Sequence, residues 1–257
     1  ILEQTNLLGK KIILRLDLNV PLDNRKIADT TRIDKILPTL EFLLKQNSKI
    51  IILSHVGRPK GKIVDSLSLK PIGEEIKKKL NEEVKLIKNN ILEMNKNFLD
   101  NFNEKILLIE NIRFYPEEEK NDLNFAKHLA SLGDIYVNDA FSCSHRAHAS
   151  VCEISKFLPS FSGLQLDSEI SALKKITSEI TKPVTCIIGG SKISTKIAVL
   201  KNLSKKMDTI VIAGGMANNF LRYHGYNIQS SLHEENVNHL IEEIINFSAK
   251  NNCKLVL

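Results

Sequence analysis

Apolar runs alternate along the chain with segments whose apolar residues recur every three or four positions. This alternation is typical of βαβ units, in which buried parallel strands are joined by right-handed helical crossovers. We therefore predict an α/β fold with two Rossmann-like, three-layer α/β/α domains and parallel sheets. The predicted strands are 11–20, 49–56, 81–87, 105–112, 135–141, 183–190, 208–215 and 253–257, and the predicted helices are 32–46, 69–80, 122–132, 192–204, 216–224 and 233–250.

One stretch interrupts this pattern and divides the chain. KFLPSFSGLQLDSEISALKKI (156–176) carries Pro, Ser and Gly and then a helical periodicity. We predict a first α/β domain over residues 1–160, a connecting segment and helix over 161–182, and a second α/β domain over 183–257. The second set has too few strands for a doubly wound sheet, so this domain is expected to be truncated in this chain.

The composition indicates a soluble globular protein. Of 257 residues, 42% are hydrophobic and 26% are charged. No window is apolar enough to cross a bilayer and no secretory pattern opens the chain, so we expect a cytoplasmic protein with no membrane partner. The four cysteines are too few and too scattered for a disulfide framework, so free thiols are expected. A net charge of +6 indicates anionic partners of some kind.

Polar side chains follow the predicted strands of the first domain. Ligands of open parallel sheets bind beyond the carboxyl ends of the strands. Strand alternation places Arg15, Asp17 and Asn19 on one face of the first strand. Arginine is scarce among the basic residues, so an arginine here suggests a position that needs a planar, bidentate donor. The strand ends, with the helix start after DTT (29–31), offer a set suited to a phosphorylated, carboxylated small molecule: Asp17, Asn19, Arg32, His55, Arg58, Arg113, His145 and Arg146.

Two turns of the second domain indicate a nucleotide site. IIGGSKISTK (187–196) and IAGGMANNF (212–220) each read as a strand, a Gly-Gly turn and a helix. A helix beginning near Ser191 would offer amide donors and the positive end of its dipole to a phosphate. Lys192 and Lys196 are four residues apart and are predicted to share one face of that helix. The spacing is not that of a GxxxxGK[ST] loop.

A zinc site is an alternative interpretation of DAFSCSHRAHAS (139–150). Cys143, His145, His148 and Cys152 are the donor types of such a site, but their gaps are irregular. We favour both cysteines as small buried residues and His148 as a packing residue.

Two other function classes are alternatives to a small-molecule enzyme of this kind. The basic balance makes a nucleic-acid-binding module the main alternative, although aromatic residues are only 5% of the chain and Trp is absent. A dinucleotide-dependent oxidoreductase is disfavoured, because no GxGxxG follows the first strand.

Six motifs, in order and at fitting separations, resemble the phosphoglycerate kinase family over essentially the whole chain. They are RLDLNVP, SHVGRPKG, LIENIRFYPEEE, YVNDAFSCSHRAHAS, GGSKISTK and AGGMANNF. The resemblance implies an enzyme (EC 2.7.2.3) of glycolysis that transfers a phosphoryl group reversibly between 1,3-bisphosphoglycerate and ADP, giving 3-phosphoglycerate and ATP. It implies two domains that close around a cleft, a monomer, no nucleic-acid partner, and Mg²⁺ that is carried with ADP or ATP rather than bound by ligands within this chain.

The resemblance also implies roles for individual residues. Arg32 is expected to be the catalytic cation, and Lys192 to lie at the transferring group. Phosphoglycerate is expected against Asp17, Leu18, Asn19, Arg32, His55, Val56, Gly57, Arg58, Arg113, His145 and Arg146. The nucleotide is expected against Gly190, Ser191, Lys192, Lys196, Gly214 and Gly215.

This chain departs from the family pattern in two respects. The family usually has Gly and Thr where this chain has Ser142 and Cys143, so the Ser142 side chain is expected to crowd a backbone contact to the substrate. The family's later Gly-rich phosphate loop, adenine pocket and metal-binding Asp would follow Leu257. The 257-residue chain by itself is therefore expected to bind substrate and to turn over poorly.

Overall fold

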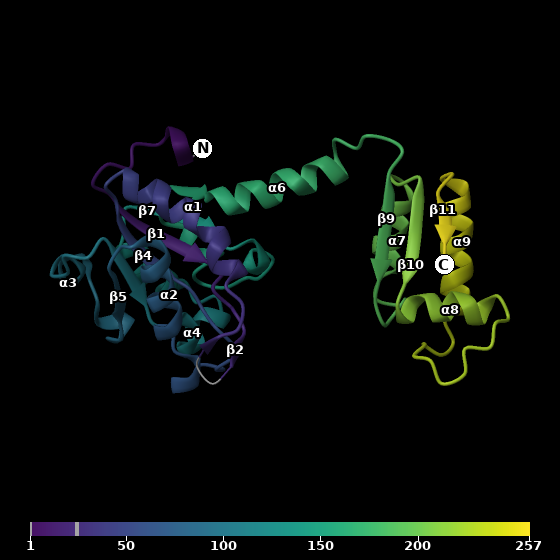
Figure 1. The fold of residues 1–257 in the computed structure, drawn as a ribbon, viewed down its shortest axis with the longest axis horizontal. Coiled ribbons are helices and arrows are strands. Elements are labelled where there is room, and N and C mark those ends of the chain that lie inside the picture. Colours follow the sequence, from purple (N-terminus) through teal and green to yellow (C-terminus); the bar gives the residue numbers. More distant parts are fainter. Residues whose placement is uncertain (1, 24–25) are drawn as a thin grey trace. The chain divides into compact units, whose positions relative to one another are not determined.

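The computed structural model describes residues 2–23 and 26–257. The chain divides into two compact units, residues 1–170 and 171–257 (Figure 1). The division falls inside helix α6 (Leu164–Thr177), within the predicted connecting segment 161–182. No helix in the described ranges combines the length and the apolar character needed to cross a membrane.

The first unit is built on a six-stranded sheet whose strands all run parallel. The central strand β1 pairs on one side with β4 and on the other with β7, so the ends of these three strands lie together at one edge. The order across the sheet is β5 (Val84–Ile87), β6 (Ile106–Ile109), β4 (Lys49–Leu53), β1 (Lys11–Leu16), β7 (Ile135–Asp139) and β8 (Ser160–Ser162).

Helices cover both faces of this sheet, because alternate residues of each buried strand point to opposite sides. Ile12 and Leu14 pack in one core with α1 (Thr31–Lys45) and α2 (Lys70–Leu80). Ile13 packs in the other core with α3 (Lys96–Asp100) and α5 (Leu123–Ser131). The remaining elements of the unit are the antiparallel pair β2 (Leu22–Asp23) and β3 (Lys26–Ile27), the short helix α4 (Pro116–Glu119), and 3₁₀ turns at Leu2–Gln4, Asp65–Leu67, Ile91–Glu93, Ile112–Phe114, Phe141–Cys143 and Glu153–Lys156.

The second unit contains a three-stranded parallel sheet in the order β11 (Lys254–Val256), β10 (Thr209–Ala213) and β9 (Thr185–Gly189). Its helices α7 (Ile197–Ser204), α8 (Gly215–Tyr223) and α9 (Asn238–Lys250) share one core with the buried residues of β10. The opposite face carries Ile187, whose side chain is 74% exposed. The predicted α/β class with parallel sheets in two parts is confirmed.

Most strands end earlier than the sequence predicted, and the short strands β2, β3 and β8 were not predicted. β1 ends at Leu16 and β4 at Leu53, so the polar residues that follow them lie in loops rather than in the sheet. β8 escaped prediction because its three residues, Ser-Phe-Ser, carry no apolar run. It pairs with β7 at the edge of the sheet, where a short polar strand is tolerated.

Candidate functional site

The polar residues predicted at the strand ends come together around one cavity of about 170 Å³ in the first unit. Its lining comes from the loops after β1, β4, β6 and β7 and from the start of α1. Leu18 and Val56, which were also predicted for this site, are buried in the core, and His145 is exposed outside the lining. The residues that line the cavity are Asp17, Asn19, Arg32, His55, Gly57, Arg58, Arg113, Ser142, Cys143 and Arg146.

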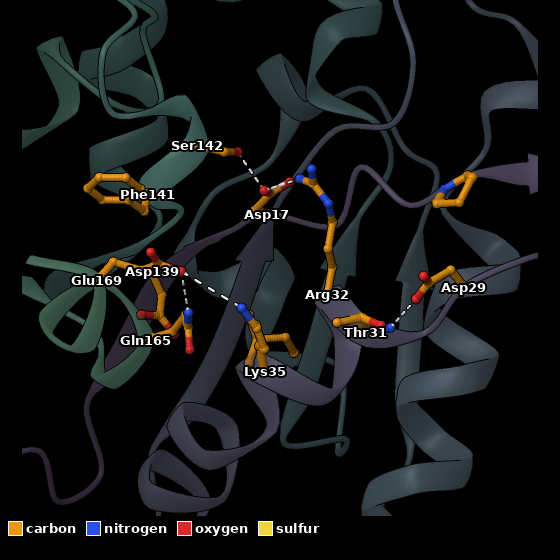
Figure 2. Close-up of a pocket in the computed structure, with 12 residues that line it drawn as sticks. Asp17, Asp29, Thr31, Arg32, Lys35, Asp139, Phe141, Ser142, Gln165 and Glu169 are labelled. Atoms are coloured by element: carbon orange, nitrogen blue, oxygen red, sulfur yellow. Dashed lines mark hydrogen bonds and ion pairs between the residues drawn. The ribbon is translucent and has the colours of Figure 1, made fainter. Parts of the chain in front are cut away.

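Arg32 lines this cavity, and its guanidinium faces the Asp17 carboxylate in the loop after β1 (Figure 2). It lies at the N-terminus of α1, as predicted, and is the second residue of that helix; its Nη1 forms an ion pair with Asp17 Oδ2. The Ser142 hydroxyl donates to the same Asp17 oxygen. Asp17, Arg32 and Ser142 also line a second cavity of about 420 Å³ beside the first. Asp17 therefore orients the Arg32 guanidinium, and its carboxylate already has hydrogen-bond partners within the chain.

The predicted capping segment DTT (29–31) caps the start of α1 through Asp29. The N-cap residue Thr30 makes no side-chain cap, and its hydroxyl instead donates to Asp34 Oδ2 (2.9 Å). Asp29 supplies the acceptor, because its Oδ1 receives the backbone N–H of Thr31 (2.6 Å). The pKa of Asp29 is lowered first by a side-chain hydrogen bond with Thr31 and then by this backbone hydrogen bond. The capping segment therefore includes Asp29 and places Arg32 in the first turn.

The loop after β4 is tied to two other strand ends. Gly57 adopts a positive φ of 66°, and a Cβ there would lie 2.7 Å from Leu67 Cδ2. Its backbone N–H donates to Asn19 Oδ1 (2.9 Å), and its carbonyl accepts from Arg113 Nη1 (3.1 Å). Asn111, which the sequence did not single out, donates to the Val56 carbonyl (2.8 Å) and accepts from the Arg113 N–H (3.1 Å). Hydrogen bonds from the loops after β1 and β6 therefore fix the conformation of the turn at Gly57.

The cavity is strongly cationic. Arg113 is 4% exposed, and its burial lowers its pKa; its Nε lies 3.4 Å from Glu119 Oε1 without the alignment of a hydrogen bond. Arg58 and Arg146 are exposed and form no ion pair with any residue in the described part of the chain. Four arginines therefore line the cavity beside one carboxylate, and two of them are available to an anion.

Burial keeps the site's histidine neutral. His55 is 3% exposed, and its pKa falls to about 2, first because burial disfavours the charged ring and then because Arg15 and Arg113 lie close. His148 is likewise buried, with a pKa lowered to about 4 mainly by burial. Both rings therefore lack a charge at neutral pH.

The zinc interpretation finds no support in the geometry. Cys143 is buried beside Ala140 and Val151, whereas Cys152 is exposed. The prediction of a buried Cys152 was therefore wrong, because the residue precedes a short surface 3₁₀ turn. Across the described residues, no three His, Cys, Asp or Glu side chains are grouped so as to hold a metal ion.

The Gly-Gly turns of the second unit lie against each other. Gly214 has a φ of 64° and precedes α8, as the predicted strand-turn-helix requires. The Gly190 carbonyl accepts the Met216 N–H (2.8 Å). A Cβ on Gly215 would lie 3.2 Å from Ser191 Cα, so a side chain here would require the neighbouring backbone to shift.

The helix predicted to begin near Ser191 was wrong. α7 begins at Ile197, and residues 191–196 are an irregular stretch that ends in a turn at 194–196. Glu234 accepts both the N–H (3.0 Å) and the hydroxyl (2.6 Å) of Ser194, which holds this stretch outside the helix. Lys192 lies in this irregular stretch and Lys196 is the N-cap of α7, so the two lysines do not share a helix face.

The whole chain is similar to proteins of one family. A family model described as "Phosphoglycerate kinase" matches residues 2–257. The chain is 46% identical over 257 residues to a phosphoglycerate kinase of Wolbachia sp. subsp. Brugia malayi (strain TRS) and 47% identical over 268 aligned residues to one of Wolbachia pipientis wMel. These alignments cover all of this chain and 64% of each relative, so the chain spans about 64% of their length.

A solved structure agrees with the sequence relatives. The phosphoglycerate kinase from Coxiella burnetii matches this fold with a TM-score of 0.88 and 37% sequence identity. The match covers 99% of this chain and 64% of that one.

Proposed function

The chain belongs to the phosphoglycerate kinase family, and from this premise we propose that it binds 3-phosphoglycerate or 1,3-bisphosphoglycerate in the four-arginine cavity of the first unit. The nucleotide, ADP or MgATP, is proposed to bind at the Gly-Gly turns of the second unit. Together they would carry out reversible phosphoryl transfer in cytoplasmic glycolysis. The observation that carries the proposal is the set of four arginines around a cavity with a single carboxylate.

The charge of the cavity suits such a substrate. 3-Phosphoglycerate carries a phosphate at one end and a carboxylate at the other, and both accept bidentate hydrogen bonds from guanidinium groups. Arg58 and Arg146 have no competing carboxylate partner among the described residues, so binding an anion there displaces no ion pair. His55 adds a neutral hydrogen-bond donor, because its pKa of about 2 excludes a charge at physiological pH.

The chemistry asks for positioning and charge stabilisation rather than a nucleophilic side chain. An oxygen of the β-phosphate of ADP attacks the phosphorus of the acyl phosphate of 1,3-bisphosphoglycerate. The bond between this phosphorus and the C1 oxygen breaks, and 3-phosphoglycerate leaves as a carboxylate. Negative charge spreads over the phosphoryl oxygens in between. Arg32, held by Asp17, is proposed to stabilise that charge. Loss of an arginine in such a role costs on the order of 10³-fold or more in rate.

The second-unit turns are proposed to receive the nucleotide phosphates. α8 begins directly after Gly214 and offers the positive end of its dipole. Lys192 and Lys196 are proposed as exposed cations before α7 rather than as a pair on one helix face. Gly190 and Gly215 keep this surface free of side chains. Mg²⁺ would arrive as part of the nucleotide substrate.

Calorimetric titration of the chain with 3-phosphoglycerate tests the first-unit assignment. Arg58→Ala and Arg146→Ala are each expected to weaken binding by roughly 10- to 100-fold, since each removes a charged hydrogen-bond donor. Arg222→Ala is the matched control, because Arg222 pairs with Glu235 in the second unit and does not line the cavity. Binding by the parent chain is also expected to weaken with added salt.

The titration has outcomes that count against the proposal. Absence of heat with the parent chain at millimolar ligand and low salt would remove the assignment. Equal loss of affinity in the Arg222→Ala control would show that general charge, rather than this cavity, attracts the ligand.

A further inference from the structure

Arg15 is fully buried at the centre of the sheet, beneath the four-arginine cavity, which is called the anion cavity below. Its Nε donates to Ser150 Oγ (2.9 Å), and its Nη1 donates to the Leu16 carbonyl (2.5 Å). Its Nη2 lies 3.0 Å from His55 Nδ1. A buried guanidinium is costly unless it is hydrogen-bonded and paired with a negative charge. Arg15 therefore requires a compensating group within the core.

The direction of these hydrogen bonds follows from what each group is able to donate. A guanidinium has N–H donors and no acceptor, so His55 Nδ1 must accept from Arg15. The proton of a neutral imidazole is then on Nε2. His55 lines the cavity, so the ring presents a donor to this site. Ser150 Oγ likewise accepts from Arg15, and its own proton is directed elsewhere.

That proton goes to a buried carboxylate. Ser150 Oγ donates to Glu118 Oε1 (2.6 Å), and the Ser150 N–H donates to Glu118 Oε2 (2.9 Å). Glu118 is fully buried, and burial raises its pKa while Arg15 and the Ser150 hydrogen bonds oppose that rise. The Tyr136 hydroxyl donates to the Ser150 carbonyl (2.8 Å) and fixes the backbone of this residue. A carboxylate that accepts at both oxygens supplies the negative charge that Arg15 needs.

We propose that Glu118 and Ser150 are positioning residues for Arg15. Arg15 in turn fixes His55 in the tautomer whose Nε2–H is offered to the substrate. The role in substrate binding rests on the proposed function, whereas the tautomer itself is a property of the chain without ligand. Sequence patterns did not connect these residues, because they come from four separate segments of the first unit.

The surroundings of His55 favour a neutral ring. Besides Arg15, the charged and titratable groups that act on it are Arg113, Arg146 and His148, and each of them disfavours protonation. The ring is therefore a directed hydrogen-bond donor without charge. A freely exchanging pair of tautomers would present this donor for only part of the time and would bind an anion more weakly.

Nitrogen-15 NMR of the histidine rings tests the tautomer on the ligand-free, isotope-labelled chain. Long-range proton–nitrogen correlation spectra distinguish a protonated from an unprotonated ring nitrogen. His55 is expected as a single Nε2–H tautomer that does not change between pH 5 and pH 8. An Nδ1–H tautomer, or a ring that titrates in this range, overturns the proposal whatever the variants do.

Two variants test the positioning residues. Ser150→Ala removes the hydroxyl between Arg15 and Glu118, and Glu118→Gln removes the charge while keeping the shape. Both are expected to move the His55 nitrogens toward a mixture of tautomers. Ser144→Ala is the control, because its hydroxyl bonds to the Ala140 carbonyl in the same loop region and not to Arg15. If a folded Ser150→Ala or Glu118→Gln chain keeps the single His55 tautomer of the parent chain, the substituted residue is not a positioning residue.

Titration with 3-phosphoglycerate then separates this inference from the proposed function. Ser150→Ala is expected to weaken binding roughly tenfold, and Ser144→Ala less than twofold. If the parent chain has the Nε2–H tautomer but does not bind 3-phosphoglycerate, the proposed function fails and the tautomer assignment stands. If the parent chain binds but shows the other tautomer, the inference fails and the proposed function stands.

Discussion

At the scale of single residues, burial rather than residue type decides the charge of the site. Arg32, Arg58, Arg113 and Arg146 keep their positive charge in every setting, since guanidinium groups are not deprotonated in proteins. His55 does not, because its ring is enclosed among positive charges and lacks a buried carboxylate partner of its own. The site therefore combines permanent cations with a neutral donor.

The lowered histidine pKa values predict a pH dependence of stability. Histidine titrates near 6.5 in an unfolded chain, whereas His55 has a pKa of about 2 and His148 of about 4. Between these values the unfolded chain binds more protons, so the free energy of unfolding falls as the pH is lowered below about 6.5. Glu118 and Asp139 act in the opposite direction at lower pH, because burial raises their pKa values and the folded chain then binds protons first.

Urea denaturation at pH 7.5 and pH 5.5 measures this effect. The parent chain is expected to lose about 1 kcal/mol more of its free energy of unfolding between these values than a His55→Gln chain. His239→Gln, at an exposed position of α9, is the control and should keep the parent's pH dependence. Identical pH dependence in the parent and His55→Gln would show that His55 is not held neutral by the fold.

At the scale of elements, one carboxylate joins β7, α1 and α6. Asp139 ends β7 and is buried; its Oδ2 accepts from Thr39 of α1 (2.6 Å), and its Oδ1 accepts the Leu166 N–H at the start of α6 (2.8 Å). The helix that carries Arg32 and the helix that leaves the first unit are therefore anchored to the same strand end. This junction depends on a close approach of the chain at Gly163.

Gly163→Ala is expected to destabilise the first unit by about 1–3 kcal/mol through overpacking. A Cβ at this position would lie 2.4 Å from both Cγ and Oδ1 of Asp139, which its hydrogen bonds hold in place. Gly189→Ala is the matched control, since its Cβ would lie 3.8 Å from the nearest atom, the Ala213 carbonyl oxygen. Denaturation curves of the two variants compare the effects, and a neutral Gly163→Ala would mean that the junction is able to relax.

At the scale of the whole molecule, the chain has separate cores in its two units. The first unit has a core on each face of its six-stranded sheet, and the second has its own core around Phe220 and Ile210. Every residue that lines the anion cavity belongs to the first unit. Anion binding is therefore expected to depend on the first unit and not on the packing of the second.

Phe220→Ala tests this independence. Loss of the ring from a fully buried position is expected to cost about 3–5 kcal/mol of stability in the second unit. The affinity for 3-phosphoglycerate, measured by calorimetry, is expected to change less than twofold. Leu108→Ala in the first unit is the comparison and is expected to reduce binding along with stability. Loss of binding in Phe220→Ala would show that the second unit contributes to the site.

The sequence by itself determined the long strands and helices of the alternating pattern and the residues that follow those strands. Buried parallel strands and amphipathic helices have local periodicities, and parallel strands necessarily bring their carboxyl ends to one edge. For this reason Asp17, Arg58 and Arg113 were predicted at one site before any contact was known. The same local reasoning placed Arg15 on the face of Asp17, although it is buried beneath the cavity.

Only the tertiary structure decided how those residues are held. The neutral His55 depends on burial and on charges that lie far away in the sequence, and the chain of hydrogen bonds from Glu118 through Ser150 crosses 32 residues. The turn that replaces the predicted helix before Ile197 depends on Glu234, 40 residues beyond Ser194. Such contacts have no local periodicity, because they arise when segments distant in sequence pack together. Periodicity therefore identified the helices and strands, whereas packing decided where they end and whether the buried side chains of the site are charged.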